Sequence, residues 1–209
     1  ADRLVVLFSH HNLGTLGNPL PDPANPTEER MTAEAVEALL HRYPNVVAWV
    51  NGHTHVNRVN PRPDPAGRTQ GFWDINTAAH VDYPEHARLV EIVDNRDGTL
   101  SIFATLIEHA APAATAVGAT DVLGLAAISR ELSINDFQDD PVNRLGAAVD
   151  RNVELVLPAP FVLAATAAAP ADTRRDALLP ATGGPLDARL ALGAAALGGA
   201  LALRRRTVT

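Results

Sequence analysis

Histidines follow two apolar runs near the start of the chain. His10 and His11 come directly after the run 4–8, and a second pair lies in the turn 52–55, after the run 46–50. Short apolar runs of this kind are typical of buried strands, so both pairs are expected at strand ends. Imidazole is the side chain that most commonly binds metal ions, and two neighbouring strands would bring these rings together. The pattern therefore predicts a metal site at one edge of a sheet.

The second pair lies in the sequence Gly52-His53-Thr54-His55. Gly52 lacks a Cβ, and we expect it to form the turn that directs both imidazoles toward one point. A lone His-x-His is more often an ordinary hydrogen-bonded surface pair than a metal site. The presence of two such pairs, each at a strand end, favours metal binding.

The runs VVLFSHHNL and VVAWVNGHTHVNRV resemble the last two metal-binding motifs of the calcineurin-like metallophosphoesterases. The later run FWDINTAAHVDYPEHARLVEIVDNRDGTLSIFATLIEH is similar to the closing β-segment of that family, particularly of its secreted actinobacterial members. The resemblance covers residues 1–110. It implies an α/β (α+β) fold, namely the C-terminal half of a β-sandwich of two sheets flanked by helices. Residues 111–163 are expected to extend the same domain with a helix and a strand.

By this resemblance, His10 and His53 would bind one metal ion and His55 would bind a second. Imidazole and carboxylate ligand sets accept Fe, Mn or Zn. His11 is the candidate catalytic residue, beside the first ligand and on the substrate side. The implied reaction is hydrolysis of a phosphoester, in which two ions hold the attacking hydroxide and the phosphoryl oxygens. Nucleotides, lipid head groups, phosphoproteins and sugar phosphates all remain candidate substrates.

Three other motifs of the family are absent from the chain: Asp-x-His, Gly-Asp-x-x-Asp and Gly-Asn-His. These motifs supply the carboxylate and asparagine ligands. We therefore expect the chain to be the C-terminal part of a longer enzyme and to be inactive by itself. Two alternatives remain. One is a non-catalytic, wall-anchored binding module with a degenerate phosphoesterase fold; the other is a mononuclear histidine site, which is disfavoured because it has no carboxylate to balance the charge of the metal.

Composition narrows the class of partner. The formal net charge is −7, the acidic residues are dispersed, and every basic residue is Arg. A nucleic-acid surface would need a basic patch, so none is expected. The chain has no Cys, which leaves neither disulfides nor thiolate metal sites.

The predicted elements alternate with loops rich in Pro and Gly. Thr27 is expected to cap a helix that ends at Tyr43-Pro44. Asp74 and Asn76 share one face of a strand, and we expect that face to be exposed to solvent. Asp97-Gly98 predicts a hairpin turn. Strands are expected at 4–8, 46–50, 72–77, 87–94, 100–107 and 151–157, the three central ones with antiparallel pairing, a second helix at 120–133, and loops at 12–27 and 60–71.

The remaining histidines are expected to have no metal-binding role. His80 and His86 lie in a loop and are predicted to be at the surface, although one of them could face a substrate. His41 and His109 have no motif around them.

The C-terminal part of the chain changes in character. Residues 164–178 are rich in Ala, Pro and Thr and read as a disordered linker. Residues 179–209 begin with the motif Leu-Pro-Ala-Thr-Gly, continue with an apolar stretch at 190–203 that is expected to form a helix, and include three Arg at 204–206. Arg residues at the end of an apolar segment stay on the cytoplasmic side of a membrane.

This order of motif, apolar segment and basic tail resembles the cell-wall sorting signal of Gram-positive surface proteins. The motif residues are Leu179, Pro180, Thr182 and Gly183. By the resemblance, a sortase would cleave between Thr182 and Gly183 and join the chain to peptidoglycan, after transient membrane insertion of the apolar segment. The protein is then expected outside the cell, anchored to the wall. The alternatives are a plain C-terminal membrane anchor and a glycolipid-anchor signal.

Overall fold

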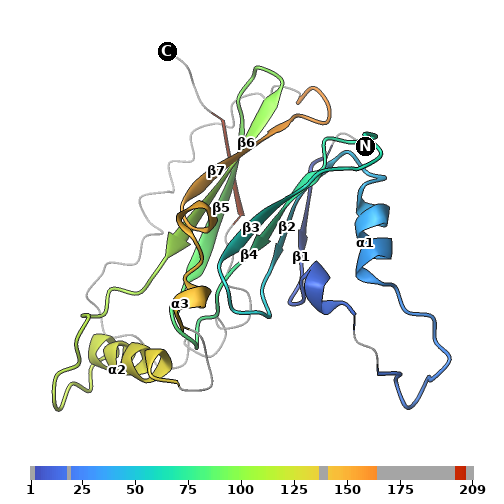
Figure 1. Cartoon of the computed structure of the whole chain (residues 1–209). Coiled ribbons are helices and arrows are strands. Elements are labelled where there is room, and N and C mark those ends of the chain that lie inside the picture. Colours follow the sequence, from blue (N-terminus) through green and yellow to red (C-terminus); the bar gives the residue numbers. More distant parts are fainter. Residues whose placement is uncertain (1–2, 18–19, 137–140, 164–200, 206–209) are drawn as a thin grey trace, which may run out of the picture.

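Two four-stranded sheets form the framework of the computed structural model, which describes residues 3–17, 20–136, 141–163 and 201–205 (Figure 1). The first sheet has the order β1-β2-β4-β3 and the second β7-β6-β5-β8. The helices are few and short. The strands are β1 (Val5–Phe8), β2 (Val46–Asn51), β3 (Arg58–Arg62), β4 (Phe72–Asn76), β5 (Ala87–Asp94), β6 (Thr99–Ile107), β7 (Val153–Pro158) and β8 (Leu201–Arg205); the helices are α1 (Ala33–Leu40), α2 (Val122–Ile134) and α3 (Pro141–Arg144), with 3-10 turns η1 (Leu13–Thr15) and η2 (Ala148–Asp150).

The two sheets pack against each other through one apolar core. Val47, Ala48 and Ile75 of the first sheet contact side chains of β5, β6 and β7, among them Leu100 and Ile102, and all five are completely buried. Burial of this apolar surface drives the two sheets together. The predicted mixed α/β class with two sheets is therefore confirmed.

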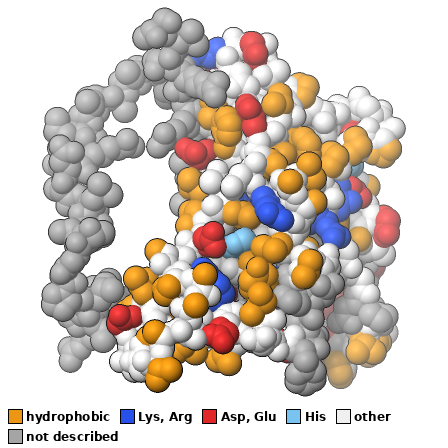
Figure 2. All heavy atoms as spheres, turned by 60° about the vertical axis from the view of Figure 1, so that its left-hand side comes forward, with side chains coloured by type: hydrophobic (Ala, Val, Ile, Leu, Met, Phe, Trp, Pro, Cys, Tyr) orange, Lys and Arg blue, Asp and Glu red, His pale blue; other side chains and the backbone are white. Residues whose placement is uncertain are grey.

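The opposite face of the first sheet is covered at one end by α1 and η1 (Figure 1). Trp49 and Phe72 pack there against Val36 and Leu40 of the helix. These contacts hold η1, and with it the loop that follows β1, against the sheet. Figure 2 shows the side of the molecule that carries α2, where apolar side chains lie at the surface between isolated charged ones.

The first helix begins later than predicted. Its N-cap is Thr32, whose hydroxyl accepts a hydrogen bond from the backbone N–H of Ala35 at 3.2 Å, and Thr27 lies outside the helix. The helix ends at Leu40. Met31 is exposed, so the helix forms only where its apolar residues can reach the sheet.

Strand β3 falls partly in a segment that the sequence predicts as a loop. It contains Pro61 and pairs antiparallel with β4. Proline lacks the N–H that a central strand needs, but β3 lies at the edge of its sheet, where this loss is tolerated. The proline that predicted a loop therefore marks an edge strand.

The three central strands are not one antiparallel unit. β5 and β6 form the predicted hairpin, with Arg96 and Gly98 at positive φ in its turn. β4 belongs to the other sheet, where it pairs parallel with β2. In this position Ile75 of β4 packs beside Val47 and Ala48 of β2 in the core between the two sheets.

The expected C-terminal helix is wrong for residues 201–203. Residues 201–205 form β8, which pairs parallel with β5 and supplies hydrogen-bond partners for an otherwise open edge. Residues 190–200 of the expected apolar helix and the linker at 164–178 lie outside the described residues. Within the part of the chain that the structure describes, no helix is both long and apolar enough to span a membrane.

Candidate metal centre

Two adjacent parallel strands bring the histidine pairs to one edge of the first sheet. β1 pairs with β2 in parallel, so their carboxyl ends lie side by side. The pairing continues past the strands, because the N–H of Gly52 donates to the carbonyl oxygen of His10 at 3.1 Å. Ser9 likewise donates its N–H to Val50 at 3.2 Å. The loop after β1 and the turn after β2 are thereby held against each other.

Three imidazoles meet at this edge. One nitrogen from each of His10, His11 and His53 lies within 4.8 Å of the others, and all three side chains are exposed. Nδ1 of His53 is 3.1 Å from Nε2 of His10, and the rings of His11 and His53 have centroids 4.0 Å apart. Zn–N bonds of about 2.0–2.1 Å in tetrahedral geometry place ligand nitrogens about 3.4 Å apart. The three rings therefore fit a transition-metal ion with only small rotations.

His53 is biased toward the neutral form that binds metal. Burial lowers the pKa of His53, and the neighbouring His11, His10 and His55 lower it further, because protonation would add like charge. A metal ion binds the neutral imidazole. The surroundings of His53 thus favour its metal-binding form over its protonated form.

The turn that carries His53 is not made by glycine. Gly52 has an ordinary φ, and a Cβ there would meet only backbone oxygens at 3.7 and 3.9 Å, so the predicted role of this glycine is wrong. Instead His53 and His55 adopt φ values of +67° and +55°. Residues other than glycine rarely adopt this left-handed backbone conformation, and such backbone strain is typical of functional sites.

A buried network of amides stabilises the strained turn. Asn76 donates to the carbonyl oxygen of Gly52 at 2.6 Å and to Oδ1 of Asn51 at 2.7 Å, and it accepts from the hydroxyl of Thr54 at 2.9 Å. Asn51 in turn donates to Asp74 at 2.7 Å. Asp74 and Asn76 are buried, so the prediction that their face is exposed is wrong. Both side chains instead hold the backbone that positions His53.

Ser9 supports the other half of the cluster. Its hydroxyl donates to the carbonyl oxygen of His11 at 2.6 Å and accepts from the indole N–H of Trp49 at 2.7 Å. Because Trp49 is buried in the sheet, this chain of bonds ties the His10-His11 backbone to the core. The ring of His11 also contacts the hydroxyl of Thr15, with Nδ1 3.2 Å away.

His55 lies apart from the three-histidine group and has its own carboxylate. Its Nδ1 makes a hydrogen bond to Asp82, which also pairs with Arg144 at 2.7 Å. Burial raises the pKa of Asp82, but the hydrogen bonds from Arg144 and His55 outweigh it and hold the pKa below the usual value. A carboxylate on Nδ1 is the usual arrangement that leaves Nε2 of a histidine free for a metal.

Asp82 and Arg144 are the residues that sequence reasoning missed. Asp82 is 27 residues from His55 and Arg144 lies in α3, so only the folded chain brings the three together. The one signal in the sequence is that Asp82 lies between two loop histidines, His80 and His86.

Those two histidines differ from each other. His80 is exposed, as predicted, whereas His86 is buried and Nδ1 of its ring contacts Asn57 at 3.0 Å, so the predicted surface position is wrong for His86. His41 is buried beside α1, and His109 contacts Glu85 at 2.6 Å. The sorting-motif residues Leu179, Pro180, Thr182 and Gly183 lie outside the described residues.

Replacement of Asp82 by asparagine tests the role of this carboxylate. The depressed pKa means that the ionised form is stabilised by folding. Its contribution is therefore present above the unfolded value of about 3.9 and is lost as the pH falls through the lower folded pKa. We expect D82N to be less stable than the parent chain at pH 7 and equally stable near pH 2 in urea denaturation. A stability difference that does not change with pH would contradict the ion-pair role.

No protein-family model, curated protein or solved structure matches this chain. Its function therefore has to be inferred from the side chains of the site and from the motifs that carry them.

Proposed function

We propose that this chain supplies the histidine ligands of a metal-dependent phosphoester hydrolase. The observation that carries the proposal is the meeting of His10, His11 and His53 at the carboxyl ends of adjacent parallel strands. Open α/β sheets bind their ligands at this edge. The sequences Ser-His-His and Gly-His-Thr-His, which resemble the phosphoesterase motifs, lie there.

A bound transition metal would lower the pKa of its water ligand and so provide the nucleophile for hydrolysis. His10, His11 and His53 would hold the ion, and their exposure leaves it open to an incoming ester. Ser9 and Asn76 would keep the two ligand-bearing segments in place through their hydrogen bonds. Asn12, next to His11 in the chain, offers a side-chain amide to phosphoryl oxygens, whereas the hydroxyl of Thr54 already donates to Asn76.

The lack of a carboxylate among the candidate metal ligands affects whether the chain can be active by itself. Among the described residues, no Asp or Glu joins the three imidazoles. A dinuclear site of the resembled family also uses carboxylates, which in this proposal come from sequence outside these 209 residues. The chain is then expected to bind metal without catalysing turnover.

A single-ion site is the second candidate. Three imidazoles and a water are the ligands of one class of catalytic zinc site. The inclusion of His11 in the group and the separate pairing of His55 with Asp82 both favour this arrangement. It predicts one ion per chain, whereas the dinuclear arrangement predicts two.

Display on the cell wall is part of the same proposal. It is supported by the order of Leu-Pro-Ala-Thr-Gly, apolar segment and arginines in the sequence. An extracellular position also agrees with the absence of Cys, since the fold needs no reducing compartment to protect thiols.

The test uses the protein encoded by the complete gene. Its metal content is measured by mass spectrometry, and its hydrolysis of bis(p-nitrophenyl) phosphate is followed with Zn²⁺, Mn²⁺ or Fe²⁺. We expect metal-dependent turnover that is lost in H10A and H53A and kept in H80A, which removes an exposed histidine outside the three-histidine group. Metal binding without turnover on a wide panel of esters would favour the binding module, and a protein without metal would contradict the proposal.

A further inference from the structure

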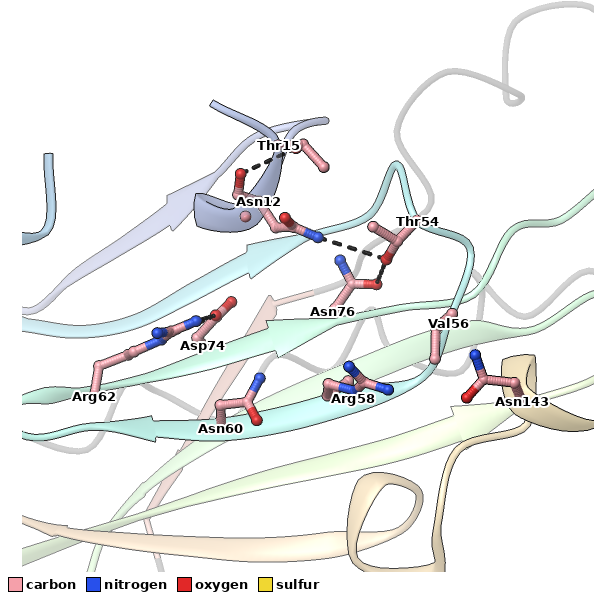
Figure 3. Close-up of a pocket in the computed structure, with 11 residues that line it drawn as sticks. Asn12, Thr15, Thr54, Val56, Arg58, Asn60, Arg62, Asp74, Asn76 and Asn143 are labelled. Carbon is pink, nitrogen blue, oxygen red and sulfur yellow. Dashed lines mark hydrogen bonds and ion pairs between the residues drawn. The ribbon is translucent and has the colours of Figure 1, made fainter. Parts of the chain in front are cut away.

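A polar pocket lies directly beside the histidine cluster. It has a volume of about 310 Å³ and is lined by residues of the loop around η1, the turn after β2, strands β3 and β4, and α3 (Figure 3). Asn12 follows His11 in the chain, and Thr54 lies between His53 and His55. Asn12 and Thr54 line the pocket, so its wall includes the residues that directly follow His11 and His53 in the chain.

The floor of the pocket is the face of β3 and β4 that carries polar side chains. In the antiparallel pairing of β3 with β4, Arg58 lies opposite Asn76, and Asn60 lies opposite Asp74. Residues directly opposite each other in such a pair point to the same face. Figure 3 shows Arg58 and Asn60 on β3 beside Asp74 and Asn76 on β4. The alternate residue Val59 belongs to the apolar core on the other face.

The carboxylate in the pocket is already neutralised. Asp74 accepts hydrogen bonds from Arg62 at 2.7 Å and from Asn51 at 2.7 Å. Asn76 is likewise engaged with the backbone of Gly52. The pocket therefore presents no free negative charge to a ligand.

Two side chains of the floor are free. Within the described part of the chain, the side chains of Arg58 and Asn60 make no hydrogen bond and no ion pair. A guanidinium offers five N–H donors, and an amide offers both donors and acceptors. Together they suit a ligand that carries negative charge and several hydroxyl groups.

The lining also discriminates between classes of ester. Among the described residues, no aromatic side chain lines the pocket, so a nucleobase finds no ring there on which to stack. Val56 is the only aliphatic side chain of more than one carbon that the described residues contribute, which disfavours a lipid chain. Its volume lies at the small end of the range for ligand sites, which suits a single sugar.

We propose that this pocket binds the sugar of a sugar phosphate whose phosphoryl group lies at the histidine cluster. The inference rests on the proposed function and assigns its substrate class. Arg58 and Asn60 donate hydrogen bonds to the sugar hydroxyls from β3. Asn12 and Thr54 contact the sugar from the opposite wall, next to the phosphoryl group.

The experiment compares two phosphates that differ only in their organic part. Binding of ribose 5-phosphate and of ethyl phosphate to the 209-residue chain is measured by calorimetry, with and without Zn²⁺. We expect ribose 5-phosphate to bind about tenfold more tightly, the value of one charge-assisted hydrogen bond of about 1.4 kcal/mol. R58A should remove this preference and N60A should reduce it, both while leaving Zn²⁺ affinity within twofold, and R42A, which removes an exposed arginine elsewhere, should retain it.

The outcomes separate the two proposals. Equal affinity for both phosphates, or tighter binding of ethyl phosphate than of ribose 5-phosphate, would overturn the sugar assignment even if Zn²⁺ binds. A preference for ribose 5-phosphate that depends on Arg58 and Asn60, in a chain that binds no Zn²⁺, would support the pocket and contradict the metal-dependent function. A preference that survives in both R58A and N60A would also overturn the inference, because it would place the sugar elsewhere.

Discussion

Alanine at His53 is expected to lower the affinity of the chain for Zn²⁺ by about a hundredfold or more. His53 contacts both other rings of the cluster, with its Nδ1 3.1 Å from Nε2 of His10 and its ring centroid 4.0 Å from that of His11. Loss of a hydrogen-bonded partner behind a ligand already costs about 10–100-fold in metal affinity, and loss of the ligand itself costs more. The affinity is measured by competition with a chromophoric chelator at pH 7.5.

The control and the contrast for this prediction come from other histidines. H80A removes an exposed histidine outside the three-histidine group and should leave the affinity unchanged. H55A distinguishes the two metal arrangements, because His55 is paired with Asp82 and lies outside the three-histidine group. In a single-ion site H55A leaves the first Zn²⁺ in place, whereas in a two-ion site it removes one of two bound ions. An H53A chain that binds Zn²⁺ as tightly as the parent would contradict the candidate centre.

The location of this centre could be read from the sequence because it depends on local signals. The apolar runs 4–8 and 46–50 correspond to β1 and β2, and the histidine pairs follow both of them. A buried strand needs only a short apolar segment to be identified. The edge of the sheet at which the histidines gather was therefore predictable.

The supporting residues were not predictable for physical reasons. Alternation along β4 shows that Asp74 and Asn76 share a face, but it does not show whether other elements cover that face. Their burial depends on η1 and on β3, which lie far away in the sequence. The partner of His55 is likewise non-local, since Asp82 comes from a loop that the fold brings back to the turn.

The conformation of the turn shows the same limit. Gly52 is the residue that sequence reasoning selects for a tight turn, because glycine has the widest choice of φ. The structure instead places the positive φ values at His53 and His55. The amide network around Asn76 compensates this strain, and such compensation is a property of the folded neighbourhood rather than of the turn sequence.

Replacement of Arg88 by methionine is the second large effect that we expect, a loss of about 3 kcal/mol in the free energy of unfolding. Arg88 lies in β5 and is only 3% exposed. Its guanidinium donates to the carbonyl oxygens of Asp150 and Arg151, both at 2.8 Å, and to the side chains of Asn57 and Thr77 at 3.1 and 3.2 Å. Methionine keeps most of the length of the side chain but removes this donor from all four acceptors. Asn57 still accepts from the N–H of Ala78, and a buried acceptor left unpaired costs about 1–3 kcal/mol.

The loss is partly offset because the folded state no longer has to bury a charge. Burial lowers the pKa of Arg88 to about 10, against the raising effect of Asp150, so the guanidinium is charged at pH 7 and its desolvation already counts against folding. Urea denaturation at pH 7 measures the net effect. R42M, an exposed arginine exchanged in the same way, should change stability by no more than about 0.5 kcal/mol.

R88M is also expected to change metal binding at the histidine cluster. Asn57 follows the His53–His55 turn by two residues. Its side-chain oxygen accepts hydrogen bonds from Arg88 and from the backbone N–H of Ala78. Its backbone N–H donates to the carbonyl oxygen of Arg144, whose side chain pairs with Asp82. Arg88 therefore ties the second sheet to the backbone that carries the ligands, and R88M should weaken Zn²⁺ binding as well as stability. If R88M lost less than about 1 kcal/mol and kept full Zn²⁺ affinity, the two sheets would position the histidines independently of this residue.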